Sequence, residues 1–205
     1  IAKNEEGIIE DAIKSVKDWV SEIIVVDSGS EDRTKEVANE LGATVIFNEW
    51  PGYGQQKRFA ENLCKNKWIL NIDADERISP ELKAEIEQLF MQGELEQKSG
   101  YFIPLVDIPN FVSKPSRFSP KKKYLRLYNK EKAGFRDSSV HDVVELHTGD
   151  SGVLKNLIIH HSYRDLENAV MKVNFYSSEL AKNAFAKNRK ASFIALMCVG
   201  FVAFW

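Results

Sequence analysis

The sequence predicts an α/β fold with a mostly parallel central sheet and helices on both faces. Residues 23–26 form a continuous β-branched run, IIVV, of the kind found in strands that are buried on both sides. Helix-like and strand-like segments alternate through the first half of the chain, as in doubly wound sheets. Asp27 and Asp73 stand directly after two of the predicted strands, where such sheets bind their ligands.

The first half is expected to begin strand, helix, strand, helix, strand. Residues 1–2 form the tail of a strand, and a helix with apolar residues at helical spacing follows. The strand at 23–26 leads into a helix that ends near Leu41, where Gly42 supplies the C-cap. Residues 43–47 form the next strand. The apolar positions of the first helix are Ile8, Ile9, Ala12, Ile13, Val16 and Val20.

The same alternation continues after a glycine-containing loop at 50–54. The pattern predicts a helix at 55–64 and a strand at 68–72. Ser79 and Pro80 then open another helix, as its N-cap and its first helical residue.

The second half has a different character, with short strand-like runs in place of regular alternation. These runs lie at 101–106, 124–128, 143–146 and 153–160, and a long helix is predicted at 166–187. The chain shows no internal repeat and no low-complexity linker, so a single folded domain is expected.

We expect that domain to cover residues 1–190 and an apolar segment to begin in residues 191–205. Residues 193–205 carry no charge and follow several basic residues, which favours contact with a membrane interface or with a neighbouring apolar surface. A core helix of the complete protein is the alternative. This run is too short for a bilayer span, which needs about 20 residues. The chain begins inside a predicted strand without methionine and ends inside this run, so both ends are expected to be cut.

The composition limits the classes of function. With 43% hydrophobic and 28% charged residues, the 205-residue chain is typical of a globular protein. Its formal net charge of -2 argues against nucleic acid as a partner of the chain as a whole. Cys64 and Cys198 match no metal-binding spacing and are expected to be free thiols, which indicates a reducing compartment such as the cytoplasm.

The sharpest candidate site is the acidic pair Asp73 and Asp75. Two carboxylates one residue apart at a strand end can share a divalent cation, and oxygen ligands suit Mg²⁺ or Mn²⁺. Such a cation bridges the phosphates of a nucleotide diphosphate. A surface acidic turn is the alternative, but the preceding strand and the second strand-end aspartate, Asp27, favour a metal site. Asp27 can accept a hydrogen bond from a nucleotide base or can cap its own turn.

Two pairs of neighbouring residues that contain histidine, His141–Asp142 and His160–His161, are weaker candidates for site residues. His141 and Asp142 form a pair suited to act as a general base for a hydroxyl nucleophile, and a solvated turn is the alternative. One of His160 and His161 can complete the metal site, and a buried structural histidine is the alternative. His147 fits a structural role.

A basic stretch separates two of the predicted strands of the second half. It contains Lys114, Arg117 and residues 121–123, and it extends to Arg126. It is either a solvated loop or a contact with a phosphorylated acceptor or anionic lipids.

The chain resembles the inverting glycosyltransferases of family 2, which have the Rossmann-like GT-A fold. The resemblance runs through residues 2–6 (AKNEE), 24–34 (IVVDSGSEDRT) and 69–76 (ILNIDADE), which fall in the family's order. A narrower similarity is to the branch that includes the lipopolysaccharide core β-glucosyltransferases. Its segments are 52–58 (GYGQQKR), 125–128 (LRLY), 140–142 (VHD) and 161–164 (HSYR).

The resemblance implies specific roles at the matching positions. Asp27 reads the nucleotide base, and Asp75 binds the metal, with Asp73 and His161 beside it. Asp142, next to His141, stands where the family has its base. The implied donor contacts are Ala2, Asn4, Glu6, Asp27, Ser30, Lys57 and Asp73, and the implied acceptor or membrane contacts are Lys121, Lys122, Lys123 and Arg126.

The implied function is transfer of a sugar from a nucleotide diphosphate sugar, with UDP favoured, to a glycolipid such as a lipopolysaccharide core. The protein would act peripherally at the cytoplasmic face of the inner membrane, with Mg²⁺ or Mn²⁺. Two departures concern the ligands: Ser28 replaces a second aspartate, and residues 119–123 replace a Gly-Trp-rich segment on the acceptor side.

Three other functions fit parts of the pattern. A polyprenyl phosphate acceptor is already ionised and needs no strong base, and the pair His141–Asp142 leans against it. A sugar nucleotidyltransferase normally carries a glycine-rich loop with lysine near the N-terminus, which residues 3–6 do not resemble. A non-catalytic domain that binds nucleotide or glycan is the fourth alternative, and the retained acidic positions argue against it.

Overall fold

The computed structural model describes residues 1–109, 112, 114–116, 118–138 and 142–163, with isolated positions between 167 and 185. The chain divides into two compact units, Ile1–Ser162 and Tyr163–Trp205. The first unit carries all of the sheet structure discussed below. The described positions between 167 and 185 are helical, as expected for the predicted helix there. The predicted apolar segment at 191–205 lies outside the described residues.

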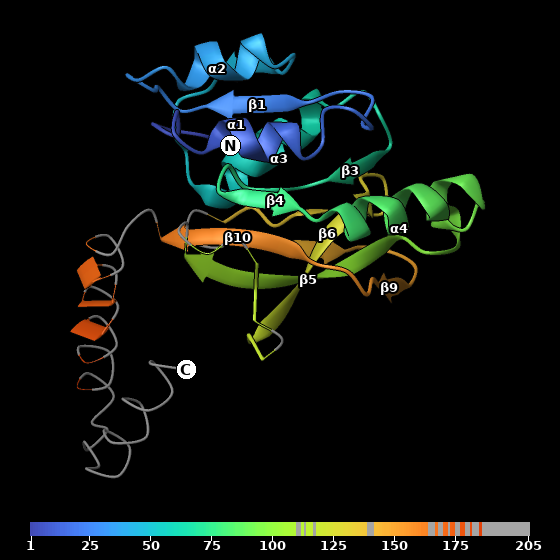
Figure 1. The fold of residues 1–205 in the computed structure, drawn as a ribbon. Helices are drawn as coiled ribbons and strands as arrows, with labels where there is room; N and C mark the ends of the chain where they lie inside the picture. The colour runs from blue at the N-terminus through green and yellow to red at the C-terminus, as the bar shows by residue number, and fades with distance from the viewer. Residues whose placement is uncertain are drawn as a thin grey trace. The chain divides into compact units, whose positions relative to one another are not determined.

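Figure 1 labels most helices and strands of the first unit and colours the chain by residue number. The first part contains α1 (Ile9–Lys14), β1 (Ile24–Asp27), α2 (Thr34–Glu40), β2 (Thr44–Phe47), α3 (Tyr53–Leu63) and β3 (Trp68–Leu70). The second part contains β4 (Glu76–Ile78), α4 (Pro80–Met91), the short 3₁₀ helix η1 (Leu95–Gln97), β5 (Gly100–Pro109), β6 (Lys121–Asn129), β7 (Ala133–Phe135), β8 (Val144–Leu146), β9 (Ser151–Val153) and β10 (Ile158–Tyr163).

The sheet arrangement is mixed, where the sequence predicted a mostly parallel sheet. Within the described residues, β1 and β2 pair in parallel, and a larger sheet has the order β3-β6-β5-β10-β4, with β9 added on β5. The pairs β3–β6, β5–β6 and β10–β4 are antiparallel. The reason lies in the connections, because a parallel crossover needs a dozen or more residues and usually a helix. No helix is described between β5 and β6, so these strands pair antiparallel.

Helix α4 begins where the sequence predicted. The Ser79 hydroxyl accepts a hydrogen bond from the Leu82 backbone N–H at 3.2 Å, and Pro80 occupies the first helical position. Leu82 and Ile86 face inward and pack in the main core with Ile103 of β5 and Ile158 of β10. The helix therefore covers the larger sheet and fixes β4, which immediately precedes it.

A cavity of about 870 Å³ is lined by α1, β1, β3 and α4. Its walls are largely apolar, with Ile13, Val25, Leu70 and Phe90 among them, and it reaches Lys57. Among the described pairings β1 bonds to β2 and β3 bonds to β6, so the two sheets are not joined to each other by a strand ladder.

Helix α3 begins in close contact with the segment that follows β7. The Gly54 N–H donates to the Ser138 carbonyl at 2.9 Å. A Cβ at Gly54 would lie 2.4 Å from the Arg136 carbonyl oxygen and 2.7 Å from that of Ser138. Only glycine lets the helix approach this backbone so closely.

Replacing Gly54 with alanine is therefore expected to push the two segments apart and to lower the free energy of unfolding by roughly 1–3 kcal/mol. Urea denaturation followed by circular dichroism measures this change. Gly7→Ala is the matched control, because a Cβ there meets nothing within 4 Å. Equal stability of the two variants would contradict the close approach.

Candidate active site

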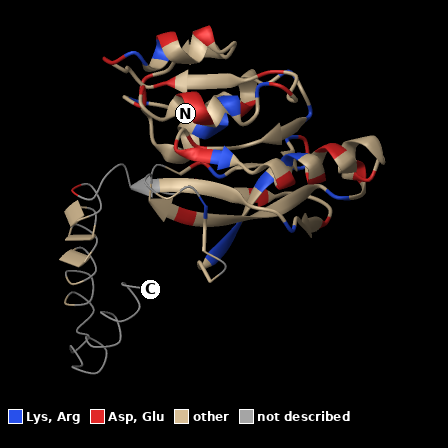
Figure 2. Cartoon of the chain, in the orientation of Figure 1, with Lys and Arg blue, Asp and Glu red and all other residues tan. Residues whose placement is uncertain are grey.

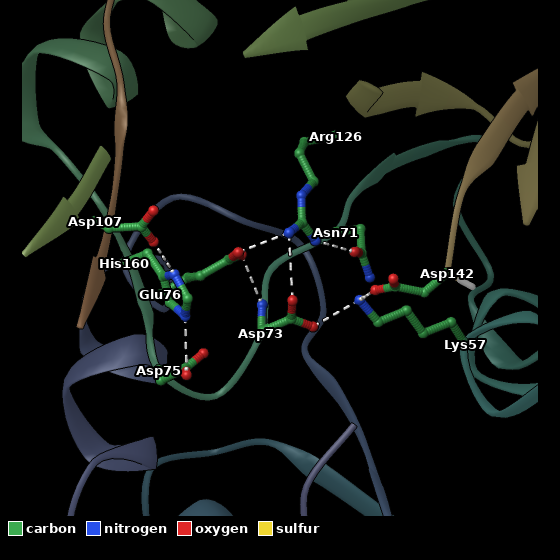
Figure 3. A network of polar contacts seen from close by, with 9 residues as sticks. All are labelled: Lys57, Asn71, Asp73, Asp75, Glu76, Asp107, Arg126, Asp142 and His160. Atoms are coloured by element: carbon green, nitrogen blue, oxygen red, sulfur yellow. Dashed lines mark hydrogen bonds and ion pairs between the residues drawn. The ribbon is translucent and has the colours of Figure 1, made fainter. Parts of the chain in front are cut away.

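The described structure brings polar side chains from several elements together at the carboxyl end of β3 (Figure 3). Helix α3 contributes to this cluster through an unusual face, because the buried residues of α3 are Gly54, Gln56, Lys57 and Glu61. A helix that faces a core normally buries apolar side chains. The buried polar face indicates that α3 positions charged groups.

Lys57 is the most enclosed of these groups, with 1% of its side chain exposed. Its Nζ lies 2.7 Å from Asp73 Oδ1 and 2.6 Å from Asp142 Oδ2. A buried ammonium group is tolerated only when it is paired. Here one lysine joins two aspartates that are far apart in the sequence, and both were predicted as site residues.

Arg126 of β6 is the second buried cation. Its Nη1 donates to Asn71 Oδ1 at 2.6 Å, and its Nη2 donates to Asp73 Oδ2 at 3.2 Å and to Glu76 Oε1 at 2.6 Å. Glu76 in turn accepts from the Asp73 backbone N–H at 2.9 Å. Both carboxylate oxygens of Asp73 therefore contact cations, one from each side.

These contacts set the charge states of the two acids. Burial alone would raise the pKa of Asp73, but Lys57 and Arg126 outweigh it and hold that pKa well below the usual range. Burial, reinforced by the negative charge of Asp73, raises the pKa of Glu76 to about 7. Asp73 is thus a permanent anion that the protein itself neutralises.

Asp75 lies in a separate part of the same cluster. Its Oδ2 is 3.0 Å from His160 Nε2, and His160 Nδ1 is 2.6 Å from Asp107 Oδ1. Burial would lower the pKa of His160, but the hydrogen bonds to Asp107 and Asp75 outweigh it and raise the pKa to about 10. The Asp75 side chain keeps 30% of its surface exposed, so it remains open to a ligand.

The sequence pointed to His161 as the metal ligand, and the structure places His160 against the Asp75 side chain. Neighbouring residues of a strand face opposite sides, so only one of the two can point toward Asp75. His161 meets Asp75 through the backbone, where its N–H donates to the Asp75 carbonyl at 2.8 Å. Its ring is buried, and Nδ1 has no hydrogen-bond partner among the described residues.

The residues predicted to bind the donor at the carboxyl end of β1 gather around one turn. Asp27 is fully buried, and its Oδ2 accepts from the backbone N–H groups of Gly29 at 2.8 Å and Ser30 at 2.9 Å. The Ser30 hydroxyl donates to Asp27 and accepts from the Asn4 backbone N–H at 2.9 Å. In this state Asp27 anchors the turn.

Two further predicted donor residues join the same region. Ala2 pairs with β1, with its N–H donating to the Val26 carbonyl at 2.9 Å. A Glu6 carboxylate oxygen accepts from the Arg33 backbone N–H at 2.9 Å, at the start of α2. The N-terminal segment is therefore attached to the turn that follows β1.

The basic residues divide into two groups. Residues 121–123 are exposed at the start of β6, where Figure 2 shows a blue segment. The Arg126 side chain is only 11% exposed and belongs to the buried network. His141 and Arg117 lie outside the described residues.

Three residues of the site, Asn71, Glu76 and Asp107, were not among those predicted from the sequence. Asn71 and Glu76 flank Asp73 within a motif that was noticed, so their position was the available signal. Asp107 is an isolated charge in an apolar strand, and its sequence surroundings give no sign that it lies near Asp75.

Comparison with known proteins identifies the family of this chain. The family model described as glycosyl transferase family 2 matches residues 1–145, more than half of the chain. The chain belongs to glycosyltransferase family 2. An uncharacterized glycosyltransferase of Rickettsia felis is 44% identical over 200 residues, which cover 94% of this chain and 71% of that protein.

This family 2 glycosyltransferase is also similar to a more distant relative and to a solved structure. The lipopolysaccharide core biosynthesis glycosyltransferase LpsC of Rhizobium meliloti is 26% identical over 208 residues, covering 96% of this chain and 74% of LpsC. The structure of S. aureus TarS 1–349 superposes with a TM-score of 0.56 at 16% identity, covering 78% of this chain and 58% of that one. The predicted GT-A fold class is thereby confirmed. In the described part of this glycosyltransferase, no helix has the length and apolar character needed to cross a membrane.

The buried network gives a direct test of its own strength. Arg126→Met leaves the buried Glu76 without its cation and the half-buried Asp73 with one fewer, which is expected to lower the free energy of unfolding by roughly 3–5 kcal/mol. The control Arg136→Met removes an exposed ion pair with Glu145 and should cost less than about 1 kcal/mol. Chemical denaturation of both variants measures the difference. Similar small losses would show that the Arg126 contacts contribute little.

Proposed function

We propose that this family 2 glycosyltransferase transfers a sugar, with inversion, from a UDP-sugar to a hydroxyl group of a glycolipid acceptor. One observation carries the proposal: the Lys57 Nζ lies within 2.7 Å of both Asp73 and Asp142. Lys57 therefore holds Asp73, the strand-end aspartate expected to contact the donor, close to Asp142, the candidate base. The similarity to LpsC supports a lipopolysaccharide core as the acceptor.

The acid-rich turn after β3 suits a divalent cation of the Mg²⁺ or Mn²⁺ type. Asp75 and His160 offer a carboxylate and an imidazole, and both donor types bind Mn²⁺. Both oxygens of Asp73 are already paired with Lys57 and Arg126, so Asp73 would support the cation site without binding the cation directly. No group of three or more potential ligands able to hold a metal ion occurs among the residues described. Mg²⁺ and its analogues are often held by one or two carboxylates plus substrate phosphates, which fits this arrangement.

When bound, the cation neutralises charge on the departing diphosphate. Asp142 accepts the proton of the acceptor hydroxyl while the acceptor oxygen bonds to the anomeric carbon and the bond from that carbon to phosphate breaks. Asp142 is 41% exposed and is held by Lys57 through Oδ2, so it is both oriented and accessible. Lys57 thereby keeps the base in place.

The start of β6 suits contact with a membrane that carries the acceptor. Residues 121–123 are three exposed lysines, and Phe118 is 88% exposed nearby in the chain. Lysines attract anionic lipid headgroups, and an exposed aromatic ring favours the interface. This surface supports a peripheral position at the cytoplasmic face of the inner membrane.

The cation assignment is tested with Asp75→Asn. This variant is expected to lose Mn²⁺-dependent UDP binding and to reduce turnover roughly 10³-fold or more, because a metal contact in the transition state contributes several kcal/mol. Calorimetry of UDP binding with and without Mn²⁺ measures the first effect. The control Asp150→Asn alters an aspartate that is 82% exposed, and it should behave as wild type. Near-normal turnover of Asp75→Asn would rule out the metal role.

The base assignment is tested with Asp142→Asn. We expect transfer to fall roughly 10²- to 10⁴-fold because the base is lost. UDP binding should be kept, because Lys57 still pairs with Asp73. Asp137→Asn, in an exposed position of the same connecting segment, is the matched control. If Asp142→Asn transfers normally and His141→Ala does not, the histidine is the base. A polyprenyl phosphate acceptor would likewise leave Asp142→Asn active.

A further inference from the structure

Asp107 is a charged, exposed residue in the otherwise mostly buried strand β5, and its contact with the site gives a reason for this position. Strand β5 is mostly buried, and Asp107 is its one exposed position. Aspartate is also disfavoured in strands, where its short polar side chain competes with the backbone. The Asp107 side chain reaches His160 on the adjacent strand β10, with Oδ1 2.6 Å from Nδ1. Among the described residues, His160 is the hydrogen-bond partner of this side chain.

Asp107, His160 and Asp75 come from three neighbouring strands or their ends. The sheet order is β5-β10-β4, and Asp75 immediately precedes β4. His160 is in register with Glu76, the residue that follows Asp75. Figure 3 shows Asp107, His160 and Asp75 in line, with the imidazole between the two carboxylates.

The contact at Nδ1 decides what the other ring nitrogen can do. In a neutral imidazole one nitrogen carries the proton and the other offers a lone pair. A carboxylate that accepts from Nδ1–H fixes the proton there and leaves the Nε2 lone pair on the opposite side of the ring. Nε2 lies on that side, 3.0 Å from Asp75 Oδ2. Without a cation, Nε2–H donates to Asp75, and a cation bound at Nε2 would take the place of this proton.

We propose that Asp107 is a positioning residue, which orients His160 and fixes its tautomer so that Nε2 can bind the cation together with Asp75. The inference rests on the proposed cation site and adds a residue outside it. Outer carboxylates of this kind typically change metal affinity 10- to 100-fold when they are removed. Asp107 does not touch the donor or the cation in this scheme, so its effect is confined to metal binding.

The test measures Mn²⁺ affinity of the full-length chain in the presence of UDP, by electron paramagnetic resonance of free Mn²⁺. Asp107→Ala is expected to weaken Mn²⁺ binding about 10- to 100-fold. Asp107→Asn keeps an oxygen acceptor for Nδ1–H and should recover most of that loss. Asp150→Ala, an exposed carboxylate elsewhere in the chain, should leave Mn²⁺ affinity unchanged.

Two further readouts separate positioning from a structural effect. Thermal unfolding without metal should show at most a small loss for Asp107→Ala, because the contact that it loses with His160 is partly exposed. The ring ¹⁵N shifts of His160, assigned by comparison with His160→Gln and recorded with UDP and Mg²⁺, should report the Nδ1–H form in wild type. They should report a mixture of tautomers in Asp107→Ala.

The outcomes distinguish the inference from the function on which it rests. If Asp75→Asn and His160→Gln lose Mn²⁺ affinity and Asp107→Ala does not, the positioning role is wrong and the cation site stands. If Asp75→Asn keeps full Mn²⁺ affinity, the proposed cation site is wrong and the inference falls with it. Loss of Mn²⁺ affinity in Asp107→Ala that equals its loss of metal-free stability would also overturn the positioning role.

Discussion

The buried ammonium group of Lys57 constrains the rest of the site. Only 1% of this side chain is exposed, so its charge has to be balanced by the protein. Asp73 approaches from the end of β3, and Asp142 approaches from the segment before β8. The cost of leaving the lysine unpaired therefore holds two distant parts of the chain together. It also explains why helix α3 presents a polar face to the interior.

Arg126 extends the same principle into the sheet. Its guanidinium group binds Asn71, Asp73 and Glu76, so Asp73 lies between two cations. Because of this pairing, Asp73 and Asp75 have different roles, although only one residue separates them. Their side chains are almost equally exposed, at 29% for Asp73 and 30% for Asp75. Both oxygens of Asp73 pair with cations, which makes it an anchor, whereas the described side-chain contact of Asp75 is the one between Oδ2 and His160. A motif of two aspartates thus supplies one fixed and one available carboxylate.

The mixed topology of the sheet is what makes the second half of the site possible. Strand β10 lies between β5 and β4, so His160 can meet Asp107 on one side and Asp75 on the other. A wholly parallel sheet with helical crossovers would have separated these segments. The antiparallel pairing of β4 with β10 therefore has a direct chemical consequence.

The sequence by itself determined the α/β class, the helix start at Ser79, and the grouping of acidic residues at strand ends. These features depend on local periodicity, capping and turn chemistry, which neighbouring residues specify. Tertiary structure alone decided that the sheet is mixed and that Arg126 is buried. It also decided that the ring of His160, and not that of His161, meets the Asp75 side chain and that Asp107 takes part. The physical reason is that strand direction and side-chain facing are fixed by pairing between segments far apart in the chain, and a shift of one residue reverses every side chain.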